Sequence, residues 1–136
     1  MPPRVIFVCT GNLNRSAAAE VVAEVYGLDA TSAGVSATPG RVMAKRMRDT
    51  LIERGYDPTR HRTRRWESPE PDDALVIGFQ PSHLRAIPYA RSLIEFIPGA
   101  TMTKVPDPHF DSTGRLHRLV LDLIEEAMPT IVETVS

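Results

Sequence analysis

Short apolar runs alternate with longer amphipathic segments along this chain, and the alternation limits the folds that are open to it. Four short runs are expected to form strands, at residues 5–9, 30–33, 74–77 and 93–97. Four longer segments repeat apolar residues at helical spacing and are expected to form helices, at residues 16–26, 41–54, 81–93 and 114–135. Strands that alternate with helices predict a parallel sheet with helices on both faces. We therefore expect an α/β three-layer sandwich built on a four-stranded parallel sheet.

Local signals mark several boundaries between these elements. Pro81 suits the first turn of a helix, where a missing amide hydrogen costs nothing. Ser112 is a candidate cap for the last helix, and Pro129 is expected to bend or break that helix late in its course. Residues 57–73 are polar and are interpreted as a long connection. No repeat or flexible linker divides the chain, so residues 1–136 are expected to form a single domain.

The composition argues against several classes of protein. A net charge of −1 gives no reason to expect nucleic acid or a membrane surface as a partner. The single cysteine excludes a disulfide framework within the chain, and the four histidines lack metal-ligand spacing, so neither a metal nor a cofactor is expected. The apolar run at residues 5–9 is too short for a signal sequence or a membrane span. We expect a cytoplasmic protein that is a monomer or a weak dimer.

The segment from Cys9 to Ser16 is the strongest candidate for a functional site. An expected strand precedes it and a helix follows it, so its backbone amides and the helix dipole favour a bound anion. Gly11 and Asn12 can adopt the positive φ angles that turn successive amides inward. The guanidinium of Arg15 can bind two phosphate oxygens at once. The pattern predicts a phosphate-binding loop made of Thr10, Gly11, Asn12, Leu13, Asn14, Arg15 and Ser16.

Cys9 begins this loop and is the candidate nucleophile. The helix terminus and Arg15 favour its thiolate form, and the hydroxyl of Ser16 can donate a hydrogen bond to the sulfur. A buried structural cysteine is the alternative interpretation. That alternative leaves the accompanying glycine, arginine and serine unexplained.

Asp107 lies between two prolines in a loop that follows the fourth expected strand. Parallel strands present their carboxyl ends at one edge of a sheet, so Cys9 and Asp107 can meet there. Alone, Asp107 is most simply a turn residue, but beside Cys9 it is a candidate general acid. His61 belongs to a basic stretch that is usually solvated, and Ser32 is equally well explained as a local cap.

These motifs resemble those of the low-molecular-weight protein tyrosine phosphatases. That family has a cysteine, five residues, an arginine and a serine after its first strand, as this chain has from Cys9 to Ser16. The segments that resemble further family motifs, in the same order, are 32–34, 61–64, 82–85 and 105–108. The resemblance covers essentially the whole chain.

The resemblance implies a phosphatase that acts on phosphotyrosine in phosphorylated proteins through a phosphocysteine intermediate. Cys9 would attack phosphorus, Arg15 would bind the phosphoryl oxygens and Asp107 would protonate the leaving oxygen. The residues that would hold the loop in its shape are Asn12, Ser32 and His61.

The resemblance also assigns a substrate cleft to Leu13, His109 and Phe110. Leu13 is apolar, as in the tyrosine-directed members, whereas arginine-phosphate-directed relatives have a threonine there. His109 and Phe110 stand where relatives often have two tyrosines, which predicts a wider cleft. Asn14 replaces a second cysteine that many relatives have, so Cys9 cannot be protected by that internal disulfide.

Two other functions are consistent with the same loop. An arsenate reductase coupled to an external small thiol would need only Cys9, but such relatives usually lack the Gly11–Asn12 pair and the Asp107 loop. A non-catalytic phosphate-binding regulatory protein would also keep the loop. The presence of Cys9, Arg15 and Asp107 together argues against that second alternative.

Overall fold

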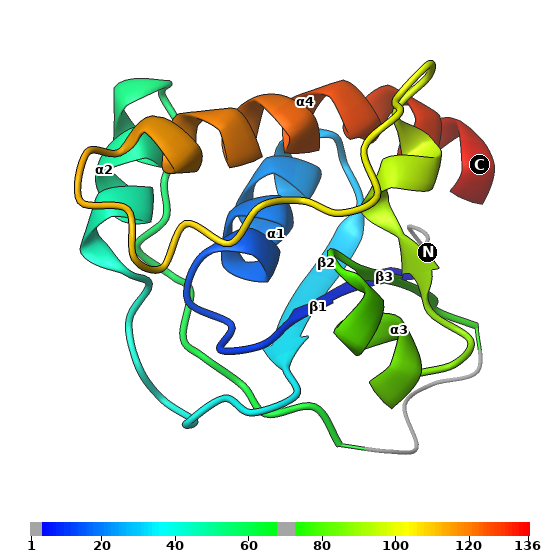
Figure 1. Cartoon of the computed structure of the whole chain (residues 1–136), viewed down its shortest axis with the longest axis horizontal. Coiled ribbons are helices and arrows are strands. Elements are labelled where there is room, and N and C mark those ends of the chain that lie inside the picture. Colours follow the sequence, from blue (N-terminus) through cyan, green and yellow to red (C-terminus); the bar gives the residue numbers. More distant parts are fainter. Residues whose placement is uncertain (1–3, 68–72) are drawn as a thin grey trace.

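The chain folds as an α/β sandwich around a four-stranded parallel sheet (Figure 1). The computed structural model describes residues 4–67 and 73–136. In chain order the elements are β1 (Arg4–Cys9), α1 (Arg15–Val25), β2 (Asp29–Gly34), α2 (Lys45–Glu53), β3 (Leu75–Gly78), α3 (Pro81–Ala86), β4 (Arg91–Ser92), the 3₁₀ helix η1 (Leu93–Phe96) and α4 (Arg115–Val135). The strands lie in the order β2-β1-β3-β4, and each neighbouring pair is parallel. The expected architecture is confirmed.

Helices cover both faces of the sheet. On one face, α1 packs against α4, and α2 also packs against α4 (Figure 1). Phe7 of β1 belongs to the large buried cluster on that side. On the other face, near α3, a smaller cluster consists of Ile6, Val8, Val76 and Ile87. This alternation along β1 is the two-residue period of a strand that is buried on both faces.

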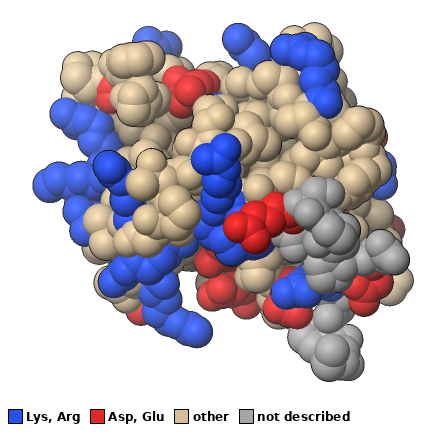
Figure 2. All heavy atoms as spheres, turned by 90° about the horizontal axis from the view of Figure 1, so that it is seen from below, with Lys and Arg blue, Asp and Glu red and all other residues tan. Residues whose placement is uncertain are grey.

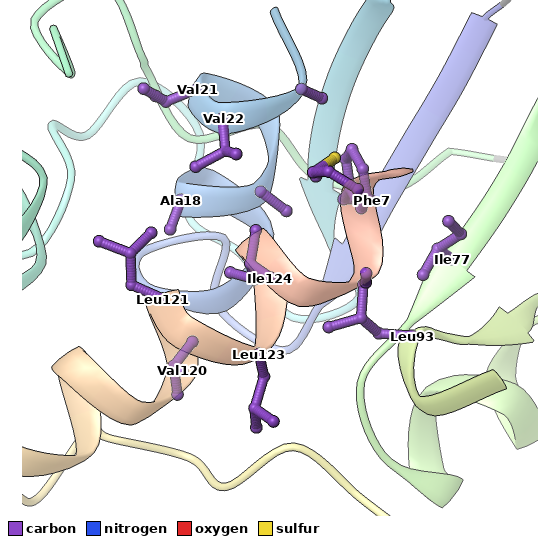
Figure 3. Close-up of a cluster of buried hydrophobic side chains, with 14 of the residues drawn as sticks. Phe7, Ala18, Val21, Val22, Ile77, Leu93, Val120, Leu121, Leu123 and Ile124 are labelled. Carbon is purple, nitrogen blue, oxygen red and sulfur yellow. The ribbon is translucent and has the colours of Figure 1, made fainter. Parts of the chain in front are cut away.

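The larger cluster fills the space between the sheet and the helices. Figure 3 shows Phe7 and Ile77 of the sheet facing the same region as Val22 of α1 and Ile124 of α4. The side chains that α4 buries recur three or four positions apart: His117, Val120, Leu121, Leu123, Ile124, Ala127, Met128 and Ile131. Each large apolar side chain that is fully buried contributes about 1.5–3 kcal/mol. This periodicity is the reason that the sequence located α4 correctly.

The fourth strand lies just before the segment that was expected to form it. The sequence predicts a strand at residues 93–97, but the strand is Arg91–Ser92, and Leu93–Phe96 is the helix η1. The hydroxyl of Ser92 accepts a hydrogen bond from the Ile94 amide, and the Glu95 carboxylate accepts one from the Ser92 amide. This capping box starts a helical turn directly after Ser92. The prediction of a strand at 93–97 is therefore wrong.

Two helices are shorter than the sequence predicts. α2 begins at Lys45 rather than at residue 41, and the Ala44 amide instead donates to the Leu13 carbonyl of the candidate loop. α3 ends at Ala86 rather than at residue 93, because Pro88 disfavours helical backbone at the residue before it. The first difference brings backbone to the loop that follows β1.

The start of α4 uses a different cap from the one expected. The Leu116 amide donates to Oδ2 of Asp111 at 2.6 Å, and no side-chain bond of Ser112 to the described part of the chain takes that place. These hydrogen bonds hold the pKa of Asp111 well below its usual range. Pro129 does not break α4, which continues past it to residue 135.

The expected connection at 57–73 contains little regular structure where it is described. Residues 57–67 and 73 form no regular element apart from a bridge between Arg65 and Gly34, and residues 68–72 lie outside the described part.

No helix in the described ranges 4–67 and 73–136 is long and apolar enough to cross a membrane.

Candidate active site

The candidate phosphate loop joins β1 to α1 at the carboxyl edge of the sheet. β1 ends at Cys9, and α1 begins at Arg15. The Val35 amide donates to the Cys9 carbonyl at 2.9 Å, and the Ser36 amide donates to the Thr10 carbonyl at 2.9 Å. The first part of the loop therefore continues the hydrogen bonding of the sheet.

Gly34 allows the loop to approach β2 this closely. A Cβ atom at this position would lie 2.6 Å from the Thr10 carbonyl oxygen and 2.8 Å from the Asn12 amide nitrogen. Both distances are far below van der Waals contact, and both atoms are backbone. Only glycine fits here without displacing the loop.

Asn12 is the centre of the loop's hydrogen-bond network. It has φ 58°, the positive angle expected of it, whereas Gly11 does not have a positive φ and that expectation is wrong. The Asn12 amide nitrogen donates to the hydroxyls of Ser16 and Ser32, each at 2.8 Å. Its Oδ1 accepts from the Arg64 backbone amide at 2.8 Å. The side chain is fully buried, so these contacts set the curvature of the loop.

His61 and Glu20 extend this network. Nε2 of His61 lies 2.9 Å from the Asn12 carbonyl oxygen, and the Ser32 hydroxyl donates to Oε1 of Glu20 at 2.5 Å. The same Oε1 lies 3.7 Å from Nδ1 of His61. The structure thus brings Ser32 and His61, which are distant in sequence, to the two sides of Asn12.

The Cys9 side chain lies at the base of the loop. Its sulfur is 2.9 Å from Oγ of Ser16, and Cys9 is buried and forms no disulfide. A thiolate can only accept hydrogen bonds, so in that form the Ser16 hydroxyl is the donor. The sulfur also lies next to the N-terminal end of α1, which favours negative charge.

Arg15 is almost completely buried although it carries a full charge, with 2% of its surface exposed. Nη1 donates to Oε1 of Gln80 at 2.7 Å and to the Val105 carbonyl at 3.0 Å. Nη2 lies 3.6 Å from Oδ2 of Asp107. These partners fix the plane of the guanidinium, as a buried charge requires.

Asp107 faces Arg15 across the site. Its Oδ1 accepts a hydrogen bond from the His109 amide at 3.0 Å, which leaves Oδ2 on the side of Arg15. The side chain is half exposed, so it can exchange protons with water. The prediction that the fold brings Cys9 and Asp107 to one site agrees with their shared cavity.

The cavity between these groups has a volume of about 190 Å³. The residues that line it are Cys9, Thr10, Gly11, Leu13, Asn14, Arg15, Asp107 and His109. Phe110 is not among them: it is 94% exposed and borders an adjoining depression. Its ring lies edge-on to that of His109, with the centroids 4.6 Å apart. Of the three expected cleft residues, Leu13 and His109 therefore form the wall and Phe110 stands behind His109.

Sequence reasoning missed two residues that follow β3. Gln80 holds Arg15, and the fully buried His83 contacts the Thr10 hydroxyl through Nε2 at 3.1 Å. Burial, together with the nearby charge of Arg15, lowers the pKa of His83 to about 4. Their position after a strand of the parallel sheet was the available signal, because such positions reach the same edge as Cys9.

The surface around the site is unevenly charged. Lys and Arg side chains are most frequent on the left of the face seen from below, and others lie near its centre and at its top right (Figure 2). In the basic stretch, His61 and Thr63 are buried while the arginines at 60, 62, 64 and 65 are exposed. Among the described residues, no group of three His, Cys, Asp or Glu side chains could hold a metal ion.

The fold and the site together define a hydrolase of the cysteine-dependent phosphatase class. The chain belongs to the low molecular weight phosphotyrosine protein phosphatase family, whose sequence profile matches residues 4–136. No curated protein sequence matches the chain.

Solved structures of similar proteins agree with this assignment. The YwlE arginine phosphatase of Geobacillus stearothermophilus is 27% identical, with a TM-score of 0.83, over 98% of this chain and 92% of that one. The low molecular weight protein tyrosine phosphatase of T. tengcongensis is also 27% identical, with a TM-score of 0.82, over 96% of this chain and 98% of that one. The tyrosine phosphatase AmsI of Erwinia amylovora, at 20% identity and a TM-score of 0.84 over 100% and 95% of the two chains, shares the fold.

Proposed function

We propose that this protein hydrolyses phosphotyrosine in phosphorylated proteins through a phosphocysteine intermediate. The observation that carries the proposal is the convergence of the Cys9 sulfur, the Arg15 guanidinium and the Asp107 carboxyl on one cavity. A nucleophile, an anion clamp and a general acid are the groups that cleavage of a phosphate ester by this route requires.

In the first step, the Cys9 thiolate attacks phosphorus and the bond to the ester oxygen breaks. Arg15 binds the phosphoryl oxygens and follows the charge that develops on them. Asp107 donates a proton to the leaving oxygen. A tyrosine hydroxyl has a pKa of about 10, so the unprotonated oxygen is a poor leaving group and this proton matters.

In the second step, the Asp107 carboxylate accepts a proton from water while the water oxygen attacks phosphorus. The sulfur–phosphorus bond breaks, and inorganic phosphate and the Cys9 thiolate are released. The Ser16 hydroxyl, 2.9 Å from the sulfur, stabilises that thiolate as it leaves. We assign Asn12, Ser32 and His61 to holding the loop in place, because their hydrogen bonds meet at its centre.

The walls of the cavity support an aromatic substrate. Leu13 offers an apolar surface and His109 a flat ring that is backed by Phe110. Equal identity to an arginine phosphatase and to a tyrosine phosphatase does not decide between the two substrates. Leu13 favours the planar, apolar ring of phosphotyrosine over the charged side chain of phosphoarginine.

The test compares wild type with Cys9→Ser, Asp107→Asn and the control Asp49→Asn, which changes a comparably exposed aspartate on α2. The substrates are a phosphotyrosine peptide, a phosphoarginine peptide and p-nitrophenyl phosphate. We expect no turnover by Cys9→Ser and normal turnover by Asp49→Asn. Asp107→Asn should lose about 10²–10⁴-fold on phosphotyrosine and less on p-nitrophenyl phosphate, whose leaving group needs little help.

Several outcomes would contradict the proposal. Equal, negligible rates for wild type and Cys9→Ser would favour the non-catalytic regulatory protein. Reduction of arsenate with an added small thiol, without ester hydrolysis, would favour the arsenate reductase. Faster turnover of phosphoarginine than of phosphotyrosine would reassign the substrate.

The same proposal includes the organisation of the protein. We infer that residues 1–136 act as one phosphatase domain, as a monomer or weak dimer. A reducing cytoplasmic setting suits a catalytic thiol that has no second cysteine to protect it. Sedimentation of the purified protein tests whether it is a monomer or a weak dimer. Its localisation in cells tests the cytoplasmic setting.

A further inference from the structure

The ring of His83 is held from both of its nitrogen atoms. His83 is fully buried in the first turn of α3. A Cβ atom added to Gly78 would lie 2.9 Å from the Cβ of His83, so the end of β3 packs closely against this residue. Nδ1 lies 3.0 Å from the Phe79 backbone amide, and Nε2 lies 3.1 Å from Oγ1 of Thr10. The ring therefore bridges the end of β3 and the phosphate loop.

The polarity of these two hydrogen bonds is determined. A backbone amide can only donate, so Nδ1 of His83 accepts and carries no proton. A neutral imidazole then carries its proton on Nε2, which donates to Oγ1 of Thr10. Burial and Arg15 keep His83 neutral at physiological pH, because its pKa is about 4.

This polarity leaves the Thr10 hydroxyl with its own proton to donate. Thr10 is exposed and lines the cavity together with Cys9 and Arg15. Within residues 4–67 and 73–136, the Thr10 hydroxyl makes no side-chain hydrogen bond other than the one to His83. The proton is therefore available to an anion in the cavity.

We propose that the Thr10 hydroxyl is a further substrate-binding group, which donates a hydrogen bond to a phosphoryl oxygen, and that His83 is the positioning residue that orients it. The inference rests on the proposed function only in that the cavity receives a phosphoryl group. It adds a side-chain donor to the backbone amides and the guanidinium that the loop already presents.

Binding of inorganic phosphate, measured by calorimetry, tests the Thr10 hydroxyl without depending on turnover. We expect Thr10→Val to raise the dissociation constant about tenfold, since a hydrogen bond to a charged group is lost. Thr10→Ser keeps the hydroxyl and should stay within about twofold of wild type. Equal binding by wild type, Thr10→Val and Thr10→Ser would overturn the proposal.

Two measurements test the role of His83. His83→Leu should weaken phosphate binding in the wild-type background and have no further effect in Thr10→Val, since it acts through Thr10. Nitrogen NMR should find the His83 proton on Nε2 and none on Nδ1. A proton on Nδ1, or equal effects of His83→Leu in both backgrounds, would overturn the assignment. The wild-type protein could bind phosphate as expected here and yet hydrolyse no phosphate ester. In that case the proposed function fails and this inference stands.

Discussion

The carboxamide oxygen of Gln80 accepts a 2.7 Å hydrogen bond from Nη1 of the buried Arg15. The nitrogen of the same carboxamide donates to the Ser82 hydroxyl at 2.8 Å, which fixes the orientation of the amide. Gln80 thus holds the guanidinium without neutralising its charge. The positive charge of Arg15 stays available to a bound phosphate.

Substitution of Gln80 should separate these two effects. Gln80→Leu leaves a buried N–H of Arg15 unpaired, and an unpaired buried donor costs about 1–3 kcal/mol. We expect this variant to lower kcat/KM about tenfold. Gln80→Glu keeps an acceptor but adds a negative charge, so it should mainly weaken the inhibition by phosphate. Steady-state kinetics with phosphate as competitor measure both. Unchanged phosphate inhibition in Gln80→Glu would contradict this account of the Arg15 charge.

The hydrogen bond between Ser16 and the Cys9 sulfur predicts a defect in the second chemical step. Ser16→Ala removes the donor that stabilises the departing thiolate, so hydrolysis of the phosphocysteine should slow by about 10–100-fold. Rapid mixing with p-nitrophenyl phosphate should then show a burst of one nitrophenolate per enzyme. Ser36→Ala, an exposed serine that follows β2, is the control. A slow first step without a burst would indicate that Ser16 acts on the attack instead.

Two glycines in and beside the loop should differ in how much an alanine substitution destabilises the protein. Gly34→Ala places a methyl group 2.6 Å from the Thr10 carbonyl and should destabilise the protein by about 1–3 kcal/mol. Gly11→Ala meets only the Leu13 side chain at 3.6 Å, and its φ is not positive, so its stability should stay near that of wild type. Urea denaturation midpoints measure the difference. Equal midpoints would show that β2 and the loop can separate without cost.

The buried His83 predicts a loss of stability in acid. Its pKa is about 4 in the folded protein, below the ordinary histidine value of 6.5 that holds in the unfolded chain, so the unfolded chain binds more protons between these values. The free energy of unfolding should therefore fall as the pH drops from 6.5 to 4, by on the order of 2 kcal/mol from this residue. Urea titrations across this range should show a shallower slope for His83→Leu. The remaining slope includes His117, whose pKa burial also lowers.

The sequence predicted the parts of the fold that depend on periodicity. The buried run of β1 and the apolar stripe of α4 are regular over many residues, so they identified their elements. The fourth strand was misplaced because a local capping box at Ser92 and Glu95 starts a helical turn where the apolar run alone suggests a strand. Such side-chain bonds to backbone compete with regular structure over only a few residues.

The contiguous loop was the most predictable part of the site, and Asp107, Ser32 and His61 were expected from segments that resemble family motifs. The loop from Cys9 to Ser16 is contiguous, and the spacing of its residues predicted a phosphate-binding site with a cysteine nucleophile. Gln80 and His83 act through contacts with Arg15 and Thr10 that span more than sixty positions of sequence, and their place after a strand did not reveal these contacts. The expectation that Phe110 lines the cleft failed because the turn at His109 directs its side chain away from the cavity, and the sequence does not show this orientation.

The close approach of Gly34 to the loop also connects the site to the only tryptophan of the chain. The Trp66 backbone amide donates to the Gly34 carbonyl at 3.0 Å, and its half-buried indole packs against the smaller apolar cluster. One indole therefore reports on the strand end that supports the phosphate loop. We therefore expect its fluorescence to report on unfolding at this edge of the sheet, with no label or mutation.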